Sequence, residues 1–446
     1  MELWITKISD ALWGPWTAAI LVAVGVYFIA GTGFMPFRRW RTIWRGTLGS
    51  VMGRRETNGS GVSPFQSLTT ALAGTIGTGN LAGVATALTI GGPGAVFWLW
   101  VSAVCGMMTK YAEIVLALKY RHKDNGEFIG GPMYALRFGL NSPGLGKLYA
   151  FLCLVAALGV GSSVQAGTMA SSLTGMVPDT RYVGAAAALA VGLVVFGGVK
   201  RLASLTELVM PLFSCIYIAA SLIVILLNVH TLPGVFAEIF RGAFSGTAAA
   251  GGFAGATVTM ALRTGMSRGV FSHEAGLGTA AMAHALSDAK HPAQQGLWGI
   301  AEVFIDSIVV CTATALVLLC TGVWRQPAAG PGALDGAAMT VQAFSGALHS
   351  WAGPVVALIT CVFAFAAILS WSLYGRRCVE YLTGGRRYTP LFYAAFLVST
   401  AMGAVIKPGI IWHLADIADV LLAIPNLIGL LLMSGVVFKL TREYFR

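Results

Sequence analysis

The sequence predicts an all-α polytopic membrane protein, and three observations support this fold class. Hydrophobic residues make up 56% of the 446-residue chain, charged residues only 11%, and the mean hydropathy is +0.75. Soluble domains carry about 25% charged residues. Apolar runs of about 20 residues, the length that crosses a bilayer as a helix, recur along the whole chain. These runs also lack the alternating pattern of an outer-membrane barrel.

Eleven membrane spans are expected from these runs. They cover residues 12–31, 66–90, 92–118, 147–174, 182–199, 204–228, 250–287, 293–322, 352–375, 388–406 and 412–438. The seventh is too long for one straight helix, so we expect it to include a re-entrant piece or an extracellular helix. Residues 233–243 are expected to form a short amphipathic helix at the outer interface.

The charge distribution predicts the orientation. Lysine and arginine concentrate in cytoplasmic loops. Most of the 29 lysines and arginines lie in segments that are cytoplasmic if the N-terminus is outside and the C-terminus inside. We therefore expect a multi-pass plasma (inner) membrane protein in that orientation. The same distribution accounts for the net charge of +11, so no nucleic-acid partner is expected.

The motifs give little support to an enzyme or an ATP-driven pump. No GxSxG, HExxH or GxxxxGK[ST] pattern occurs, and the seven cysteines form no CxxC pair. No enzymatic activity, organic cofactor or ATPase subunit is expected; lipid is the surrounding medium. A passive channel or a sensor remains an alternative, although a sensor would be expected to carry a soluble signalling domain.

The stretch "AGTIGTGN", residues 73–80, interrupts the second apolar span. Glycine is a poor helix former, and a buried asparagine needs hydrogen-bond partners. Broken helices near the bilayer midplane are where transporters bind substrate and ions. Close helix packing through small residues would explain the glycines too, but it explains Asn80 and the two threonines less well.

A second polar, glycine-containing interruption lies at residues 267–279, "SRGVFSHEAGLGT". If the first span is set aside, the two interruptions fall in the first and sixth of ten helices. Paired interruptions in the two halves of a chain indicate an inverted-repeat binding site. A cytoplasmic loop is the alternative, since it would accommodate Arg268, His273 and Glu274 without cost.

Several further polar residues lie within expected spans and are functional candidates. Glu302 and Asp306 are four residues apart and share a helix face. Structural ion pairs near helix ends are the alternative for some of these residues. The others are Gln165, Ser370, Ser372, Asp416, Asp419 and Asn426.

Motifs along nearly the whole chain resemble the alanine/glycine:cation symporter family. The blocks that carry the resemblance are residues 63–88 ("SPFQSLTTALAGTIGTGNLAGVATAL"), 91–100, 110–121, 130–136, 268–279, 304–324, 370–382 and 423–432. The resemblance implies a LeuT-like fold of ten core helices in two inverted five-helix repeats, preceded by one extra helix. The implied divisions are 1–62 for the extra helix and basic loop, 63–228 for the first repeat, and 229–446 for the second.

The resemblance also implies sodium-coupled uptake of small neutral amino acids, typically alanine or glycine, with glutamine preferred by some members. The implied substrate residues are Thr75, Gly77, Thr78, Gly79, Asn80, Gln165, Phe271, Ser272 and Trp371. The implied sodium ligands are Thr75, Thr78, Asn80 and Ser370. Coupling or gating candidates are His273, Glu274, Asp306 and Asp419.

The chain departs from the family pattern at three places. His273 stands where asparagine is usual, Asp419-Val420 replaces Asn-Gly, and "SSVQAGT" keeps Gln165 but loses two asparagines. Thr279 also replaces a serine. A titratable histidine near the site would permit proton sensitivity. Proton coupling and glutamine preference therefore stay open as alternatives.

Overall fold

The computed structural model describes residues 2–51, 61–124, 126–245, 257–325, 336–406 and 408–446, and nearly all of these residues are helical. The elements of the first half are α1 (Glu2–Leu12), α2 (Pro15–Gly31), α3 (Met35–Arg38), α4 (Trp40–Gly46), α5 (Leu48–Val51), α6 (Pro64–Thr75), the π-helix η1 (Gly79–Gly83), α7 (Val84–Gly91), α8 (Gly94–Lys119), β1 (His122–Asp124), β2 (Glu127–Ile129), α9 (Pro132–Gly139), α10 (Pro143–Leu158), the π-helix η2 (Gly159–Val164), α11 (Gln165–Ser172), α12 (Thr180–Val195) and α13 (Gly198–Leu227).

The described part of the second half is also helical. Its elements are the 3₁₀ turn η3 (Val229–Thr231), α14 (Leu232–Phe244), α15 (Val258–His273), α16 (Ala280–His284), α17 (Pro292–Val303), the π-helix η4 (Phe304–Cys311), α18 (Thr312–Thr321), the 3₁₀ turn η5 (Val323–Arg325), α19 (Gly336–Leu348), α20 (Ala352–Thr383), α21 (Thr389–Gly403), α22 (Pro408–Leu432) and α23 (Ser434–Phe445).

The chain is an all-α polytopic membrane protein. Seven described helices are long and apolar enough to cross a membrane, and α6 with η1 and α7 makes an eighth span bent by 47°. Thr180–Val195 and Thr389–Gly403 are apolar but shorter. The predicted count of eleven spans therefore stays a prediction.

The helical segments follow one another in two sets of five after α2. The first set is α6–α7, α8, α10–α11, α12 and α13, and the second is α15–α16, α17–α18, α20, α21 and α22. The first member of each set is interrupted. If every segment crosses the membrane once, an odd number of crossings inverts the second set relative to the first. This order is the one expected of a LeuT-like protein, and the repeat boundaries stay predictions.

The long seventh span, predicted at 250–287, is not one helix in its described part. Residues 250–256 lie outside the described residues; α15 ends at His273 and α16 begins at Ala280. The amphipathic helix expected at 233–243 is present as α14. The sequence analysis did not identify α1, α19 or α23 as helices.

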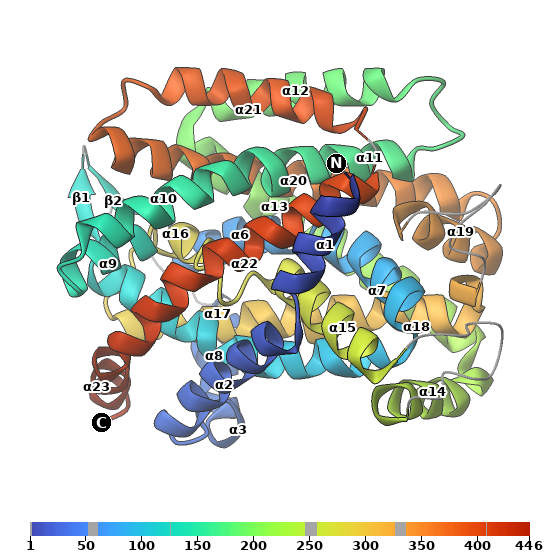
Figure 1. Cartoon of the computed structure of the whole chain (residues 1–446), viewed down its shortest axis with the longest axis horizontal. Helices are drawn as coiled ribbons and strands as arrows, with labels where there is room; N and C mark the ends of the chain where they lie inside the picture. Colours follow the sequence, from blue (N-terminus) through green and yellow to red (C-terminus); the bar gives the residue numbers. More distant parts are fainter. Residues whose placement is uncertain (1, 52–60, 125, 246–256, 326–335, 407) are drawn as a thin grey trace.

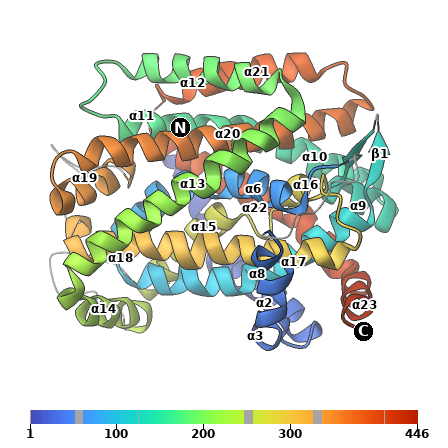
Figure 2. The ribbon, with the colours of Figure 1, turned by 180° about the vertical axis from the view of Figure 1, so that it is seen from behind.

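Figure 1 shows how these elements surround a central region. α12 and α21 run together along one edge, and α8 lies with α17 toward the opposite edge. α6, α15 and α16 occupy the middle of the molecule. The β1–β2 hairpin and α23 lie at one end, and α14 and α19 lie at the other end in both views (Figures 1 and 2). The two interrupted helices are therefore enclosed by the others.

Close contact between α8 and α14 depends on glycine. A β-carbon on Gly242 would lie 2.8 Å from the backbone nitrogen of Gly94. The same atom on Gly234, earlier in α14, would meet nothing within 4 Å. Only small residues let two helix backbones approach this closely.

This difference gives a matched pair of variants on one helix. Gly242→Ala should lower the free energy of unfolding by about 1–3 kcal/mol, because the added methyl group overpacks a backbone contact. Gly234→Ala should leave it nearly unchanged. Thermal unfolding of the detergent-purified protein measures both, and equal melting temperatures for the two variants would contradict the packing argument.

Candidate functional site

The first interruption separates α6 from η1 and leaves residues 76 and 77 outside helix. Three glycines bring this break against three different elements. A β-carbon on Gly74 would lie 2.8 Å from Tyr374 Oη, one on Gly77 would lie 3.2 Å from Gln165 Oε1, and one on Gly79 would lie 2.9 Å from the Cα of Ser272. The glycines of "AGTIGTGN" therefore allow close approach of α20, α11 and α15 to the broken backbone.

The second interruption begins where α15 ends. Glu274 caps the helix in the left-handed conformation with φ of 53°, and Gly276 and Gly278 follow with φ of 100° and 76°. Glycine adopts such angles without a steric penalty, whereas they are uncommon for other residues. The interruption thus follows a non-helical path between α15 and α16.

Side chains from other helices bind the backbone of the second interruption. Glu113 of α8 accepts a hydrogen bond from the Gly276 N–H at 2.8 Å. Asn426 of α22 donates to the Gly276 carbonyl at 2.7 Å, and Tyr149 of α10 donates to the Leu277 carbonyl at 2.8 Å. Unpaired backbone groups are costly in the membrane interior. These three side chains therefore stabilise an interruption that lipid could not.

A single cavity lies between the two interruptions. It contains seven of the nine predicted substrate residues, as well as Glu274 and Asp419. Its lining residues are Gly74, Thr75, Gly77, Thr78, Gly79, Val160, Gln165, Phe271, Glu274, Leu277, Trp371 and Asp419. The cavity is narrow, with a volume of about 10 Å³ for the centre of a water-sized molecule. The structure thus brings most of the predicted site together around a small, largely buried space.

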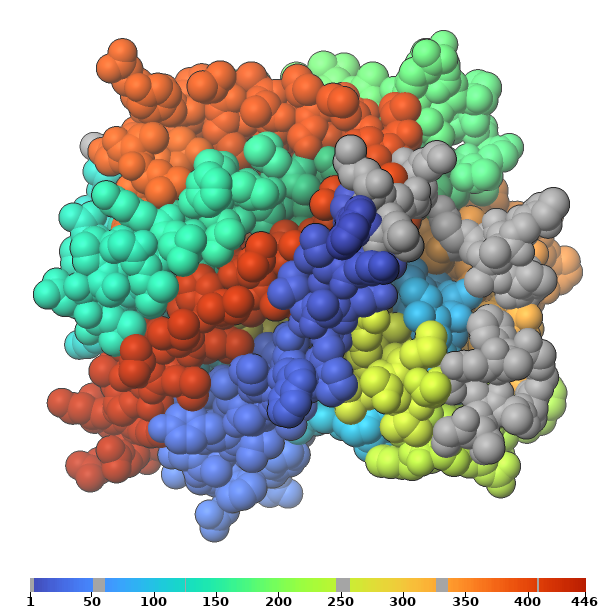
Figure 3. All heavy atoms as spheres, in the orientation of Figure 1, coloured from blue at the N-terminus to red at the C-terminus, as the bar shows by residue number. Residues whose placement is uncertain are grey.

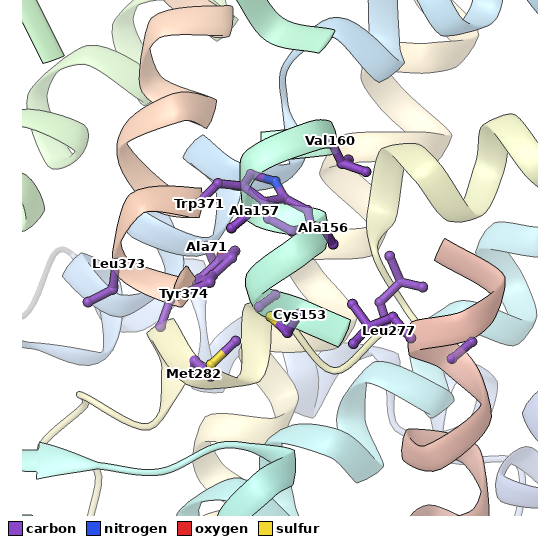
Figure 4. Close-up of a cluster of buried hydrophobic side chains, with 14 of the residues drawn as sticks. Ala71, Cys153, Ala156, Ala157, Val160, Leu277, Met282, Trp371, Leu373 and Tyr374 are labelled. Atoms are coloured by element: carbon purple, nitrogen blue, oxygen red, sulfur yellow. The ribbon is translucent and has the colours of Figure 1, made fainter. Parts of the chain in front are cut away.

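Apolar side chains pack around one part of this cavity. Figure 4 shows Trp371 and Tyr374 of α20 near Ala156 and Ala157 of α10, with Leu277 of the second interruption close by. The rings of Trp371 and Tyr374 lie 5.6 Å apart. The surface drawn in Figure 3 includes α10 in teal, α22 in red and α1 and α2 in blue. Every residue that lines the cavity is buried, so the cavity has little access to lipid.

Gln165 links the wall of the cavity to the first interruption. Its Oε1 accepts a hydrogen bond from the Thr78 N–H at 3.4 Å, and its Nε2 donates to the Val160 carbonyl at 3.5 Å. The hydroxyl of Thr78 is fully buried and has no hydrogen-bond partner among the described residues. An oxygen of this kind is available to a ligand.

Asn80 and Ser272, the other two predicted substrate residues, lie outside the cavity lining and meet on Asp306 instead. Asn80 donates to Asp306 Oδ1 at 2.7 Å, and Ser272 donates to Oδ2 at 2.9 Å. Ser307 also donates to Oδ2, at 2.6 Å. Asn80 Oδ1 accepts from the Gly77 N–H at 2.9 Å. Asp306 therefore joins the first interruption to the end of α15.

The predicted sodium ligand Ser370 lies beside α6. Its hydroxyl donates to the Thr70 carbonyl at 2.7 Å, about one turn before the break. Thr75 Oγ1 contacts Glu302 Oε1 at 3.5 Å. Of the four predicted sodium ligands, Thr75, Thr78 and Asn80 thus lie at the end of α6, beside the break and in η1, and Ser370 contacts α6 from α20. Their role as sodium ligands stays a prediction.

His273 lies next to the cavity without lining it. Its Nδ1 accepts the Ala275 N–H at 3.0 Å, so the proton of the neutral ring is on Nε2, which donates to Ser102 at 2.9 Å. Protonation of Nδ1 would break the first of these hydrogen bonds. The surroundings of His273 therefore favour a fixed, neutral imidazole.

A buried ion pair and two aromatic rings lie on one side of the cavity. Arg268 of α15 contacts both carboxylate oxygens of Asp416 in α22, at 2.6 and 2.5 Å. The Phe271 and Trp412 rings of the same two helices have centroids 4.8 Å apart. Phe271 lines the central cavity, whereas Trp412 lines a second cavity with Val164 and other residues. This contact thus separates two neighbouring cavities.

Comparison with known proteins decides the family. The model of the sodium:alanine symporter family matches residues 1–446, the whole chain. The chain belongs to the sodium:alanine symporter family. It is therefore a membrane transporter of the sodium-coupled amino-acid symporter class rather than an enzyme, as the sequence motifs predict.

The chain is similar to curated relatives over almost its full length. It is 40% identical to the sodium/alanine symporter AgcS of Methanococcus maripaludis, a match that covers 99% of this chain and 96% of the relative. It is 34% identical to a Bacillus subtilis protein named "Probable sodium/glutamine symporter GlnT", covering 98% and 89%. A solved structure of a Na⁺-coupled sialic acid symporter is 14% identical with a TM-score of 0.49, covering 97% of this chain and 85% of the other. That last likeness is too distant to carry an argument.

A buried charge network near the first interruption was missed by the sequence analysis. Lys110 of α8 contacts Glu302 Oε1 at 2.7 Å, and His284 of α16 contacts Oε2 at 2.8 Å. All three side chains are fully buried. Lys110 lies within an expected span, which is a signal that could have indicated a buried partner. Glu113 carries the same signal.

Removing one charge of the Lys110–Glu302 pair should destabilise the protein more than removing both charges. Lys110→Met should lower the free energy of unfolding by about 3–5 kcal/mol, because it leaves the Glu302 carboxylate buried without its cation. Lys110→Met with Glu302→Gln should recover most of the loss. Thermal unfolding in detergent measures both variants. A double variant no more stable than the single one would show that the ion pair is not the cause.

Proposed function

We propose that this transporter takes up small neutral amino acids, alanine or glycine, coupled to sodium by alternating access. The observation that carries the proposal is the cavity between the two interrupted helices. Seven residues predicted to bind substrate, from four separate parts of the chain, line this one buried space. Transporters with broken helices bind substrate at such a place.

The cavity lining favours a small, neutral solute. Glycine backbone forms one part of it, and Val160, Phe271, Leu277 and Trp371 contribute apolar surface. The cavity is narrow and leaves limited room for a substrate side chain. Since the lining contains no lysine, arginine or histidine, it has no cation to pair with a second substrate carboxylate. Alanine and glycine fit these limits better than glutamine does.

The oxygen atoms at the first interruption suit sodium, a hard cation. Thr75 and Thr78 offer hydroxyls and carbonyls, and the Thr78 hydroxyl is buried without a partner among the described residues. Asn80 and Asp306 add an amide oxygen and a carboxylate nearby. In the proposed mechanism these residues would hold the ion, whose charge would favour the conformation that binds the substrate carboxylate. Linkage then requires sodium and substrate to raise each other's affinity.

Alternating access needs a contact that can open on one side of the site. Arg268 with Asp416, and Phe271 with Trp412, connect α15 to α22 between the two cavities. We propose that these pairs separate when the site opens toward the side of the N-terminus. With the N-terminus outside, that opening faces the exterior.

Uptake into proteoliposomes tests the proposed function. Labelled alanine should accumulate only with an inward sodium gradient, and a membrane potential of 100 mV, inside negative, should add about 2.3 kcal/mol per sodium ion moved. Unlabelled glycine and serine should compete better than glutamine. Accumulation driven equally well by a proton gradient in choline buffer would contradict sodium coupling. Flux that only equilibrates alanine would indicate a passive channel.

Asn80→Ala tests the link between the first interruption and Asp306. The change removes the partner of the Gly77 N–H and of Asp306 Oδ1, and each lost partner of a buried polar group costs about 1–3 kcal/mol. We expect sodium-driven alanine uptake to fall roughly tenfold or more, consistent with that cost. Asn228→Ala, at the end of α13, is the control. Wild-type sodium dependence in Asn80→Ala would exclude a ligand role for Asn80.

A further inference from the structure

Asp419 of α22 stands out among the buried acids of this protein. Its side chain lines the central cavity, and the residue is only 1% exposed. Neither of its carboxylate oxygens has a hydrogen-bond partner among the described residues. A buried polar group without a partner is costly, so its retention in a cavity calls for an explanation.

The other acids around the site are engaged. Asp416 binds Arg268, Glu302 binds Lys110, and Asp306 accepts hydrogen bonds from three side chains. Glu274, the second acid in the cavity lining, accepts a hydrogen bond from Thr279. Among these carboxylates, Asp419 alone has both oxygens free to accept a ligand.

No charged group close to Asp419 is paired with it. These groups are Asp416, Glu274 and Arg268. The first two have the same sign as Asp419. Arg268 binds both oxygens of Asp416 through Nη2, and its Nη1 has no hydrogen-bond partner among the described residues, so it makes no hydrogen bond to Asp419. An ionised carboxylate is stable in a buried site only when a counter-charge accompanies it. The cavity lining contains two acids and no basic side chain. Asp419 has no ion-pair partner among the described residues, so a cationic group of the ligand would supply the counter-charge that an ionised Asp419 lacks.

We propose that Asp419 is the subsite for the ammonium group of the substrate. A primary ammonium supplies three donors and a full positive charge, which match two unpartnered carboxylate oxygens. The interrupted backbone around Thr78 and Gly79 is then left for the substrate carboxylate and the coupling ion. This assignment rests on the proposed function, because it takes the ligand to be an amino acid.

Ligand binding to the full-length detergent-purified protein tests the assignment. The probes are L-alanine and L-lactate, which differ in that lactate carries a hydroxyl where alanine carries the ammonium. Wild-type protein in sodium buffer should be stabilised against heat by alanine and not by lactate. Asp419→Asn keeps the shape and one acceptor but not the charge. It should weaken alanine binding roughly tenfold, the scale of a lost charge-assisted hydrogen bond.

Two further variants and one further ligand act as controls. Asp419→Glu keeps the charge and should retain more alanine affinity than Asp419→Asn does. Asp124→Asn makes the same change at an exposed position in the β1–β2 hairpin and should behave as wild type. The thermal shift produced by sodium alone should be the same in Asp419→Asn and wild type, which also shows that the variant is folded.

The outcomes separate this inference from the proposed function. Unchanged alanine affinity in Asp419→Asn, or an equal loss of sodium and alanine affinity, would overturn the ammonium role of Asp419. Unchanged affinity accompanied by the loss of a pH dependence would assign a proton to Asp419 and would overturn it too. If neither alanine nor glycine stabilises the wild-type protein in sodium, the proposed function fails first, and the ammonium role fails with it.

Discussion

The structure depends on one constraint: backbone groups released by a helix break inside a membrane must find partners within the protein. Two such breaks meet at the centre of this chain. At the second break, Glu113, Tyr149 and Asn426 bind the backbone directly. At the first, Asn80 and Gln165 do so. Every one of these side chains comes from a buried position, so the packing of five different helical elements follows from the need to hold two short non-helical segments.

The Asp306 carboxylate connects the two interrupted segments. Its carboxylate is shared by Asn80 and Ser272, which belong to the two different interrupted segments. Any change in their relative position must break or rearrange hydrogen bonds to that carboxylate. A transporter needs discrete conformations rather than a continuous range, and a buried, fully engaged acid favours discrete states. The network of Lys110, Glu302 and His284 adds a second such set next to Thr75.

Composition and local pattern were sufficient to predict an all-α membrane fold and the two interruptions, whereas the residues that line most of the cavity were predicted from the family resemblance. The glycines and threonines of 73–80 cannot form a stable helix alone, and that property is visible in the sequence. The pairing of Lys110 with Glu302 could not be predicted in the same way, because 192 residues separate them and only the fold brings them together. At His273, the residue type suggested a property that the surrounding structure does not favour. Its residue type predicted proton sensitivity, but the Ala275 N–H and Ser102 surround it with bonds that favour the neutral ring.

The glycines at the first interruption also limit how the site can evolve. A β-carbon on Gly79 would lie 2.9 Å from the Cα of Ser272, and one on Gly77 would lie 3.2 Å from Gln165 Oε1, so this wall has little room for side chains. Val160 and Leu277 also line the cavity, but they do not belong to the first break. Their side chains can change without disturbing the glycine backbone. A change of substrate preference is therefore easier to obtain at such positions than in the glycine wall. One rigid wall and one variable wall give this architecture a route to new specificities that preserves its mechanism.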